Sequence, residues 1–257
     1  MALELAGVRR FSAVARHQCV LMAGDPGPLI AFTVIPMVLV SVIRPMMVLL
    51  SDAMPDDMAD GTAQATAGMA VMFSLFVLKL VGAGLLDERA TWRTWDRVRA
   101  SPARLGEILV GKAAPMFAFL LVQQLLLFGF SAAAFGLRPA RGWWLVLVVS
   151  VAWPLCVLAL GTGASTLVRT SAQLSAVGDI SAVVTTIMAG ALVPSAMLPG
   201  WMRHLGPLTP GYWAMSGYRS ALNGSAPHGL SVSLAVLAGF ALAGLGAGAW
   251  AGRRASR

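Results

Sequence analysis

Residues 143–167 read WWLVLVVSVAWPLCVLALGTGASTL, and no residue in this stretch carries a charge. A helix that crosses a bilayer needs about 20 consecutive, mostly apolar residues. The stretch is long enough, and it therefore predicts a membrane-spanning helix. Other windows meet the same condition, so we expect an all-α polytopic membrane protein with six spans, at residues 28–50, 62–86, 108–136, 143–167, 174–197 and 229–251.

The composition supports this interpretation. Of the 257 residues, 58% are hydrophobic and only 12% are charged, whereas soluble domains carry about 25% charged residues. A soluble chain this apolar would expose large patches that it could not bury. The net charge of +8 could indicate a nucleic-acid partner, but the basic residues form short clusters between the apolar windows. That pattern is typical of membrane topology, and we expect no nucleic acid to bind.

The distribution of lysine and arginine predicts that both termini are cytoplasmic, because cytoplasmic loops carry the excess of basic residues. This orientation places few arginines outside, namely Arg138, Arg141, Arg203 and Arg219. It places many more basic residues inside: Arg9, Arg10, Arg16, Arg89, Arg93, Arg97, Arg99, Arg104, Lys112, Arg169, Arg253, Arg254 and Arg257. The expected location is the cell membrane, with 252–257 as a cytoplasmic tail.

Residues 1–27 predict an amphipathic helix that lies on the cytoplasmic membrane surface. Apolar and basic side chains of 3–23 fall on opposite arcs of a helical wheel, which suits an anionic lipid surface. An ordinary soluble helix that flanks a span is the alternative. The sequence Asp25-Pro26-Gly27-Pro28 then breaks the chain before the first span. No continuous apolar stretch typical of a cleavable signal peptide is evident in this segment.

The sequence offers no catalytic or metal-binding constellation. His17, His204 and His228 lack ligand spacing, and Cys19 and Cys156 are far apart in apolar or amphipathic surroundings, so we expect no disulfide. Residues 106–112 have the GxxxxGK spacing of a phosphate-binding loop, but the next residue is Ala113 and no strand precedes the motif. We therefore expect no enzyme activity and no cofactor in this chain.

The cytoplasmic loop 87–107 is the most informative stretch. Trp92, Trp95 and Val98 are spaced three residues apart, as on one face of a helix, and an acidic pair precedes them. Such an amphipathic helix can enter a groove on a partner or lie at the lipid headgroups. A basic loop with anchoring tryptophans would also explain the charges and the aromatic residues.

This loop resembles the corresponding region of the ABC-2 family of transporter permeases. Members of that family carry an acidic–basic pair after the second span, then a coupling helix, an "sP" turn and a "GK" before the third span. Glu88-Arg89, Ser101-Pro102 and Gly111-Lys112 match these in order and spacing. The string from Trp95 to Pro102 is similar to the "fDRfRSlP" of the daunorubicin-resistance branch, although Trp95 and Val98 replace phenylalanine.

A second similarity lies between the fifth and sixth spans. The family's "G…P…LP.w…..P" string, an extracellular re-entrant region, is similar to residues 190–210, and we expect 198–228 to form short extracellular or re-entrant helices. The matching residues are Gly190, Pro194, Leu198, Pro199, Trp201, Pro207 and Pro210.

The resemblance implies a half-transporter. A separate nucleotide-binding subunit on the cytoplasmic face would bind ATP and Mg²⁺, and the permease would pair with a second copy of itself or with a paralogue. Residues of the loop would then couple the permease to the ATPase, namely Glu88, Arg89, Trp92, Trp95, Asp96, Arg97, Arg99, Ser101 and Pro102.

Polar residues inside the spans are candidates for the substrate path, because they are costly in lipid. We assign this possible role to Arg44, Gln123 and Gln124, and we expect both glutamines to face protein or a cavity. Lys79 is close enough to the cytoplasmic end of its span to extend to the surface. The repeat of Gly244, Gly248 and Gly252 predicts close helix packing within the subunit.

The leading hypothesis is a permease that exports a hydrophobic or amphiphilic substrate such as a drug, an antibiotic or a lipid-like molecule. Export of a lipid-linked glycan or polysaccharide is the alternative, although only two tyrosines are present to line a sugar path. An intramembrane enzyme and a non-transporting membrane anchor are less favoured.

Overall fold

The computed structural model describes the backbone of residues 2–53, 60–90, 105–168, 170–193, 197–224 and 229–255. Side chains are described for 12–53, 60–77, 110–165, 168, 170, 172–193, 197–224 and 229–250. Within these residues every regular element is helical. The elements are α1 (Ala2–Gly24), α2 (Gly27–Ala53), α3 (Gly61–Ala90), α5 (Leu105–Phe135), α6 (Trp143–Leu167), α7 (Ser171–Met188), α8 (Gly200–Leu205), the 3₁₀-helix η2 (Gly206–Leu208), α9 (Pro210–Asn223) and α10 (Gly229–Ala255).

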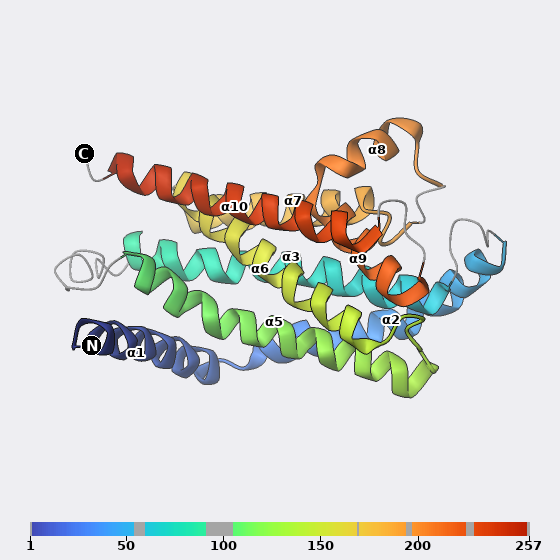
Figure 1. Cartoon of the computed structure of the whole chain (residues 1–257), viewed down its shortest axis with the longest axis horizontal. Helices are drawn as coiled ribbons and strands as arrows, with labels where there is room; N and C mark the ends of the chain where they lie inside the picture. The colour runs from blue at the N-terminus through green and yellow to red at the C-terminus, as the bar shows by residue number, and fades with distance from the viewer. Residues whose placement is uncertain are drawn as a thin grey trace.

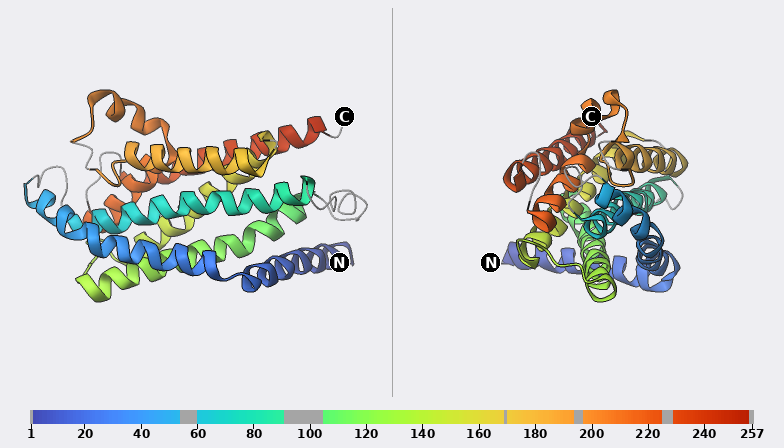
Figure 2. Two further views of the ribbon diagram at one scale, coloured as in Figure 1. Left: turned by 180° about the vertical axis from the view of Figure 1, so that it is seen from behind. Right: turned by 90° about the vertical axis from the view of Figure 1, so that its right-hand side faces the viewer.

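The helices form an elongated bundle in which α3, α5, α6 and α10 run along the long axis (Figure 1). The start of α1, the end of α10, the end of α3 and the start of α5 lie at one end, which we call the termini end. The opposite end, which we call the α8 end, holds α8 and the connection between α5 and α6. In Figure 2, α1 runs obliquely to the bundle, and it packs against α5. Its position on a membrane surface stays a prediction.

Four helices of the described chain are long and apolar enough to cross a membrane. These stretches are Gly27–Ala53, Val110–Phe135, Trp143–Ser165 and Gly229–Trp250. Two more apolar helical stretches, Gly61–Val77 and Ala172–Met188, are shorter. The predicted all-α architecture is therefore confirmed in the described residues, whereas the count of six spans stays a prediction.

Helix α7 ends at Met188, before the end of the predicted window 174–197. The amide of Gly190 donates to the carbonyl of Ile187 at 2.9 Å, and the amide of Ala191 donates to that of Thr186 at 3.2 Å. This is the Schellman arrangement, in which the residue after the cap adopts a left-handed conformation that favours glycine. Gly190 has φ of 67°. The glycine therefore ends the helix although apolar residues continue beyond it.

Helix α9 lies inside the bundle, within the segment 198–228 for which the sequence predicts short extracellular or re-entrant helices; their place relative to a membrane stays a prediction. It packs against α3, α6, α7 and α10, and Ala214, Met215 and Tyr218 are completely buried. Gly224, with φ of 76°, ends the helix. The chain segment after α8 thus returns into the protein core.

Helices α6 and α10 touch through their backbones. A Cβ atom on Gly163 would lie 2.5 Å from the carbonyl oxygen of Gly244, and one on Gly244 would lie 2.7 Å from that of Ala159. Gly248 also faces Gly163 in this contact. The predicted packing of the glycine repeat within the subunit is confirmed for Gly244 and Gly248.

Candidate functional site

Most of the predicted coupling residues lie outside the described residues. These are Trp92, Trp95, Asp96, Arg97, Arg99, Ser101 and Pro102. Glu88 and Arg89 belong to the last turn of α3, whose backbone is described but whose side chains there are not. That turn lies at the termini end of the bundle (Figure 1). The coupling role of these residues stays a prediction.

Gln124 belongs to a chain of buried hydrogen bonds that joins four helices. The hydroxyl of Tyr218 in α9 donates to Oε1 of Gln124 in α5 at 2.6 Å, and Nε2 of Gln124 donates to Oγ of Ser74 in α3 at 3.0 Å. Ser150 in α6 lies 3.2 Å from the Tyr218 oxygen. Since the single hydroxyl proton of Tyr218 already points to Gln124, Ser150 is the donor in that contact. We call Ser74, Gln124, Ser150 and Tyr218 the polar chain.

Gln123 is also buried, but its hydrogen-bond partner belongs to α2, which is not part of the polar chain. Its Nε2 donates to the carbonyl oxygen of Phe32 in α2 at 2.9 Å. Pro36 has no N–H with which to bond the carbonyl four residues before it, and that carbonyl belongs to Phe32. Gln123 therefore supplies the missing donor. The expectation that Gln123 and Gln124 face protein is confirmed, since each is at most 1% exposed.

Arg44 is far from the two glutamines. Its Nε donates to Oγ1 of Thr62 in α3 at 3.1 Å, and its guanidinium lies 4.9 Å from the ring centroid of Phe135 in α5. Arg44 follows Phe32 by twelve residues, which is about 18 Å along a helix. The three residues assigned to one possible substrate path thus do not lie together, and their role in transport stays a prediction.

A second polar cluster surrounds the end of α7. Nε of Arg219 in α9 donates to Oε1 of Gln64 in α3 at 3.1 Å, and its Nη2 donates to the Gly190 carbonyl at 3.1 Å. Nε2 of Gln64 donates to the same carbonyl, which has two lone pairs. A cation at a helix C-terminus is also stabilised by the negative end of the helix dipole. These hydrogen bonds connect the turn after α7 to α3 and α9.

The residues of the predicted re-entrant motif occupy turns and helix starts. Pro199 caps α8, Pro210 begins α9, and Leu198 is buried. The Pro207 carbonyl accepts a 2.7 Å hydrogen bond from Nε1 of Trp213. Trp201 is largely exposed, and Pro194 lies outside the described residues.

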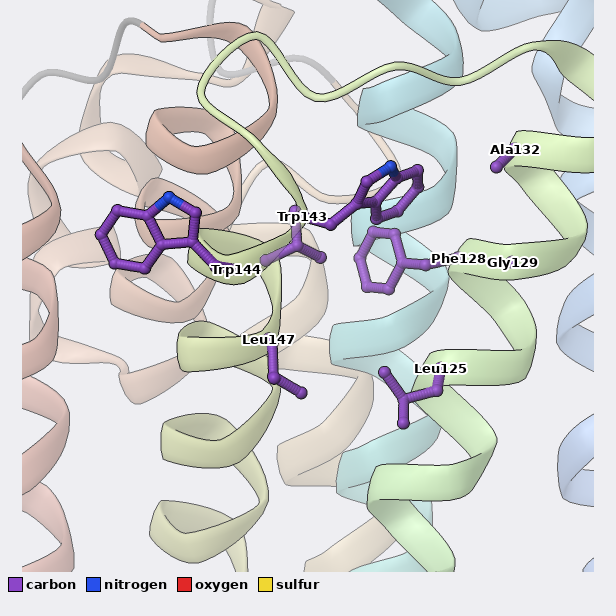
Figure 3. A pocket seen from close by; sticks show the side chains of 8 residues that line it. Leu125, Phe128, Gly129, Ala132, Trp143, Trp144 and Leu147 are labelled. Carbon is purple, nitrogen blue, oxygen red and sulfur yellow. The ribbon is translucent and has the colours of Figure 1, made fainter.

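Two apolar clefts open on the sides of the bundle. The α5–α6–α10 cleft has a volume of about 490 Å³ and includes Phe117, Leu158, Thr162 and Leu245 in its lining. The α5–α6 cleft has a volume of about 510 Å³ and lies between Leu125, Phe128, Gly129 and Ala132 of α5 and Trp143, Trp144, Val146 and Leu147 of α6 (Figure 3). Both volumes fall in the range of small-molecule sites, about 300–1,000 Å³.

Sequence reasoning missed Gln64 and Tyr218 and treated Arg219 only as an outside charge. Gln64 could have been found by the rule that selected Gln123, since a polar residue inside an apolar window must find a partner. The segment that holds Tyr218 and Arg219 is too polar to read as a span, so nothing in it indicated burial.

A bundle of long apolar helices, with a few polar side chains buried between them, defines an integral membrane protein. Residues 9–223 match the family described as ABC-2 type transporter, and the chain belongs to this family. The family comprises membrane components of transporters.

The chain is also similar to the linearmycin resistance permease protein LnrN of Bacillus subtilis (strain 168). The two are 26% identical over 168 residues, which cover 65% of this chain and 43% of LnrN. The match thus spans less than half of that relative's length.

Proposed function

We propose that this protein is the membrane-spanning permease subunit of an ATP-driven exporter. The observation that carries the proposal is the family match over residues 9–223, which includes all helices from α2 to α9. The chain would cross the cell membrane with both termini in the cytoplasm. The positions of α1 and α10 support this orientation, since their terminal ends lie at the same end of the bundle (Figure 1).

The power for transport would come from a separate nucleotide-binding subunit docked at the termini end. The end of α3 and the start of α5 lie there, so the intervening loop 87–107 begins and ends at that face. A movement of the loop would act directly on α3 and α5. Because Gln124 bonds both Ser74 of α3 and Tyr218 of α9, the polar chain would carry such a movement to α9.

The cargo would be hydrophobic or amphiphilic. The α5–α6–α10 cleft supports this class, because all the residues that line it are apolar except Thr162. The similarity to a protein named as a linearmycin resistance permease supports a drug or an antibiotic within that class. A second copy of the chain, or a paralogue, would complete the transporter.

The test is transport by the purified protein with its ATPase in proteoliposomes. The assay would follow uptake of a fluorescent amphiphilic probe with ATP or with a non-hydrolysable analogue. We expect ATP-dependent transport, and we expect Asp96→Ala to lower it about tenfold, which corresponds to about 1.4 kcal/mol, while ATPase binding persists. Asp52→Ala is the control, because Asp52 is exposed in the last turn of α2, which lies at the α8 end of the bundle and away from the loop. Equal transport with ATP and with the analogue would contradict the proposal.

A further inference from the structure

Two hydrogen-bond donors, the indoles of Trp143 and Trp144, line the α5–α6 cleft, and two arginines belong to the segment that connects its helices. Residues 136–142 connect α5 to α6 and so close the cleft at the α8 end. Arg138 and Arg141 belong to this connection and are exposed. In Figure 3 the indole nitrogens of Trp143 and Trp144 both face the connection, and the ring of Trp143 extends toward Phe128.

None of these four side chains is engaged by another described residue through a hydrogen bond or an ion pair. Arginine and the indole N–H can donate but cannot accept. Among the acidic residues described at this end, Asp60 accepts the amide of Thr62 at 2.7 Å, and Asp52 lies in the last turn of α2. The described residues that line the cleft include the two indole donors and no side-chain acceptor, and the connection beside them carries two positive charges.

Below the mouth the cleft is apolar, with Leu125, Phe128 and Leu147 along its walls (Figure 3). A ligand that fits both parts has an anionic head rich in acceptors and an apolar tail. Tryptophan is typical of the level of lipid headgroups, where one end of the ring is apolar and the other is wet.

We propose that the α5–α6 cleft is a binding site for an anionic phospholipid of the surrounding leaflet. One acyl chain lies in the cleft against Phe128 and Leu147. The phosphate and the ester oxygens accept from Arg138, Arg141 and the two indoles. The site is independent of the cargo and of the proposed direction of transport, because it requires only that the α8 end reaches the headgroups.

The experiment is native mass spectrometry of the full chain with phosphatidylglycerol or phosphatidylcholine that carry identical acyl chains. We expect the wild-type protein to prefer phosphatidylglycerol. An arginine near an anionic headgroup contributes about a fivefold change in affinity, so Arg138→Gln with Arg141→Gln removes most of the preference. Arg203→Gln is the matched control, because Arg203 is exposed on α8 and lies outside the cleft.

A second variant tests the cleft itself. Gly129 lines the cleft and a Cβ atom on it meets nothing within 4 Å, so Gly129→Leu adds a side chain to the cleft and favours the helix. We expect it to displace the bound phosphatidylglycerol, whereas Gly239→Leu, at an exposed and equally open position of α10, leaves it bound. The proposal is overturned if the wild-type protein shows no preference, or if Gly129→Leu retains the lipid.

Discussion

The side-chain amide of Gln123 in α5 donates a 2.9 Å hydrogen bond to the backbone carbonyl of Phe32 in α2. This carbonyl is the one that Pro36 leaves without a helical donor. In a membrane an unsatisfied backbone group has no water to bond, so neighbouring helices must supply the partner. The proline in α2 and the glutamine in α5 therefore depend on each other.

We predict that Gln123→Leu lowers the free energy of unfolding by about 1 kcal/mol, because it leaves the Phe32 carbonyl unpaired. In a Pro36→Ala background residue 36 regains its N–H, and the same substitution should then cost much less. The measurement is a double-mutant cycle by SDS unfolding in mixed micelles. Strictly additive effects of the two substitutions would show that the groups act independently.

Because its hydrogen bonds are buried, the polar chain should lose stability when a single oxygen atom is removed. Tyr218→Phe removes the donor to Gln124 and leaves two buried polar side chains without this partner. We expect the free energy of unfolding to fall by about 1 kcal/mol. Ser41→Ala is the control, since that hydroxyl is exposed and bonds its own helix at Met37. An equal loss in both variants would remove the special role of the polar chain.

Arg219 should not tolerate replacement by lysine. Its guanidinium bonds Gln64 and the Gly190 carbonyl with two different nitrogens, and an ammonium group does not reproduce this fork. We expect Arg219→Lys to lower the free energy of unfolding by about 1.5 kcal/mol. The melting temperature of the purified protein should fall accordingly. Arg203→Lys, on the exposed surface of α8, should leave it unchanged. A melting temperature for Arg219→Lys equal to that of the wild type would refute the assignment.

The contact between α6 and α10 predicts a graded series of alanine substitutions. At Gly244 the new Cβ would lie 2.7 Å from a backbone oxygen, so the helices must separate, and we expect a cost of about 1–3 kcal/mol. At Gly248 the nearest atom is 3.6 Å away, and at Gly246 nothing lies within 4 Å. At Gly248 and Gly246, alanine should therefore leave the free energy of unfolding unchanged or raise it by up to about 1 kcal/mol. The order of unfolding free energies checks the packing, and a reversed order contradicts it.

Much of the helical architecture could be predicted from the sequence, because a span is a property of a single continuous window. The bounds of α2, α3, α5, α6 and α10 differ from the predicted windows by only a few residues. The burial of Gln123 and Gln124 followed from the cost of polar groups in lipid. The contact of Gly244 and Gly248 with α6 followed from their spacing.

The remaining features depend on contacts between distant segments. Apolar residues continue past Met188, so hydropathy extended α7 beyond the turn that Gly190 permits. The burial of α9 depends on four other helices, and no local pattern of Tyr218 and Arg219 reveals those neighbours. The partners of Arg44 likewise come from α3 and α5. Such pairings are set by the packing of the whole bundle.

In the proposed function a separate ATPase docks on the loop after α3, at the cytoplasmic face. The most direct measurement is labelling of Trp95→Cys with a membrane-impermeant maleimide, in a background that replaces the free thiols of Cys19 and Cys156. We predict no labelling in intact cells, labelling in inverted vesicles, and protection when the ATPase is bound. Asp52→Cys, exposed near the α8 end, should show the opposite sidedness. Labelling of position 95 in intact cells would contradict a cytoplasmic position of the loop.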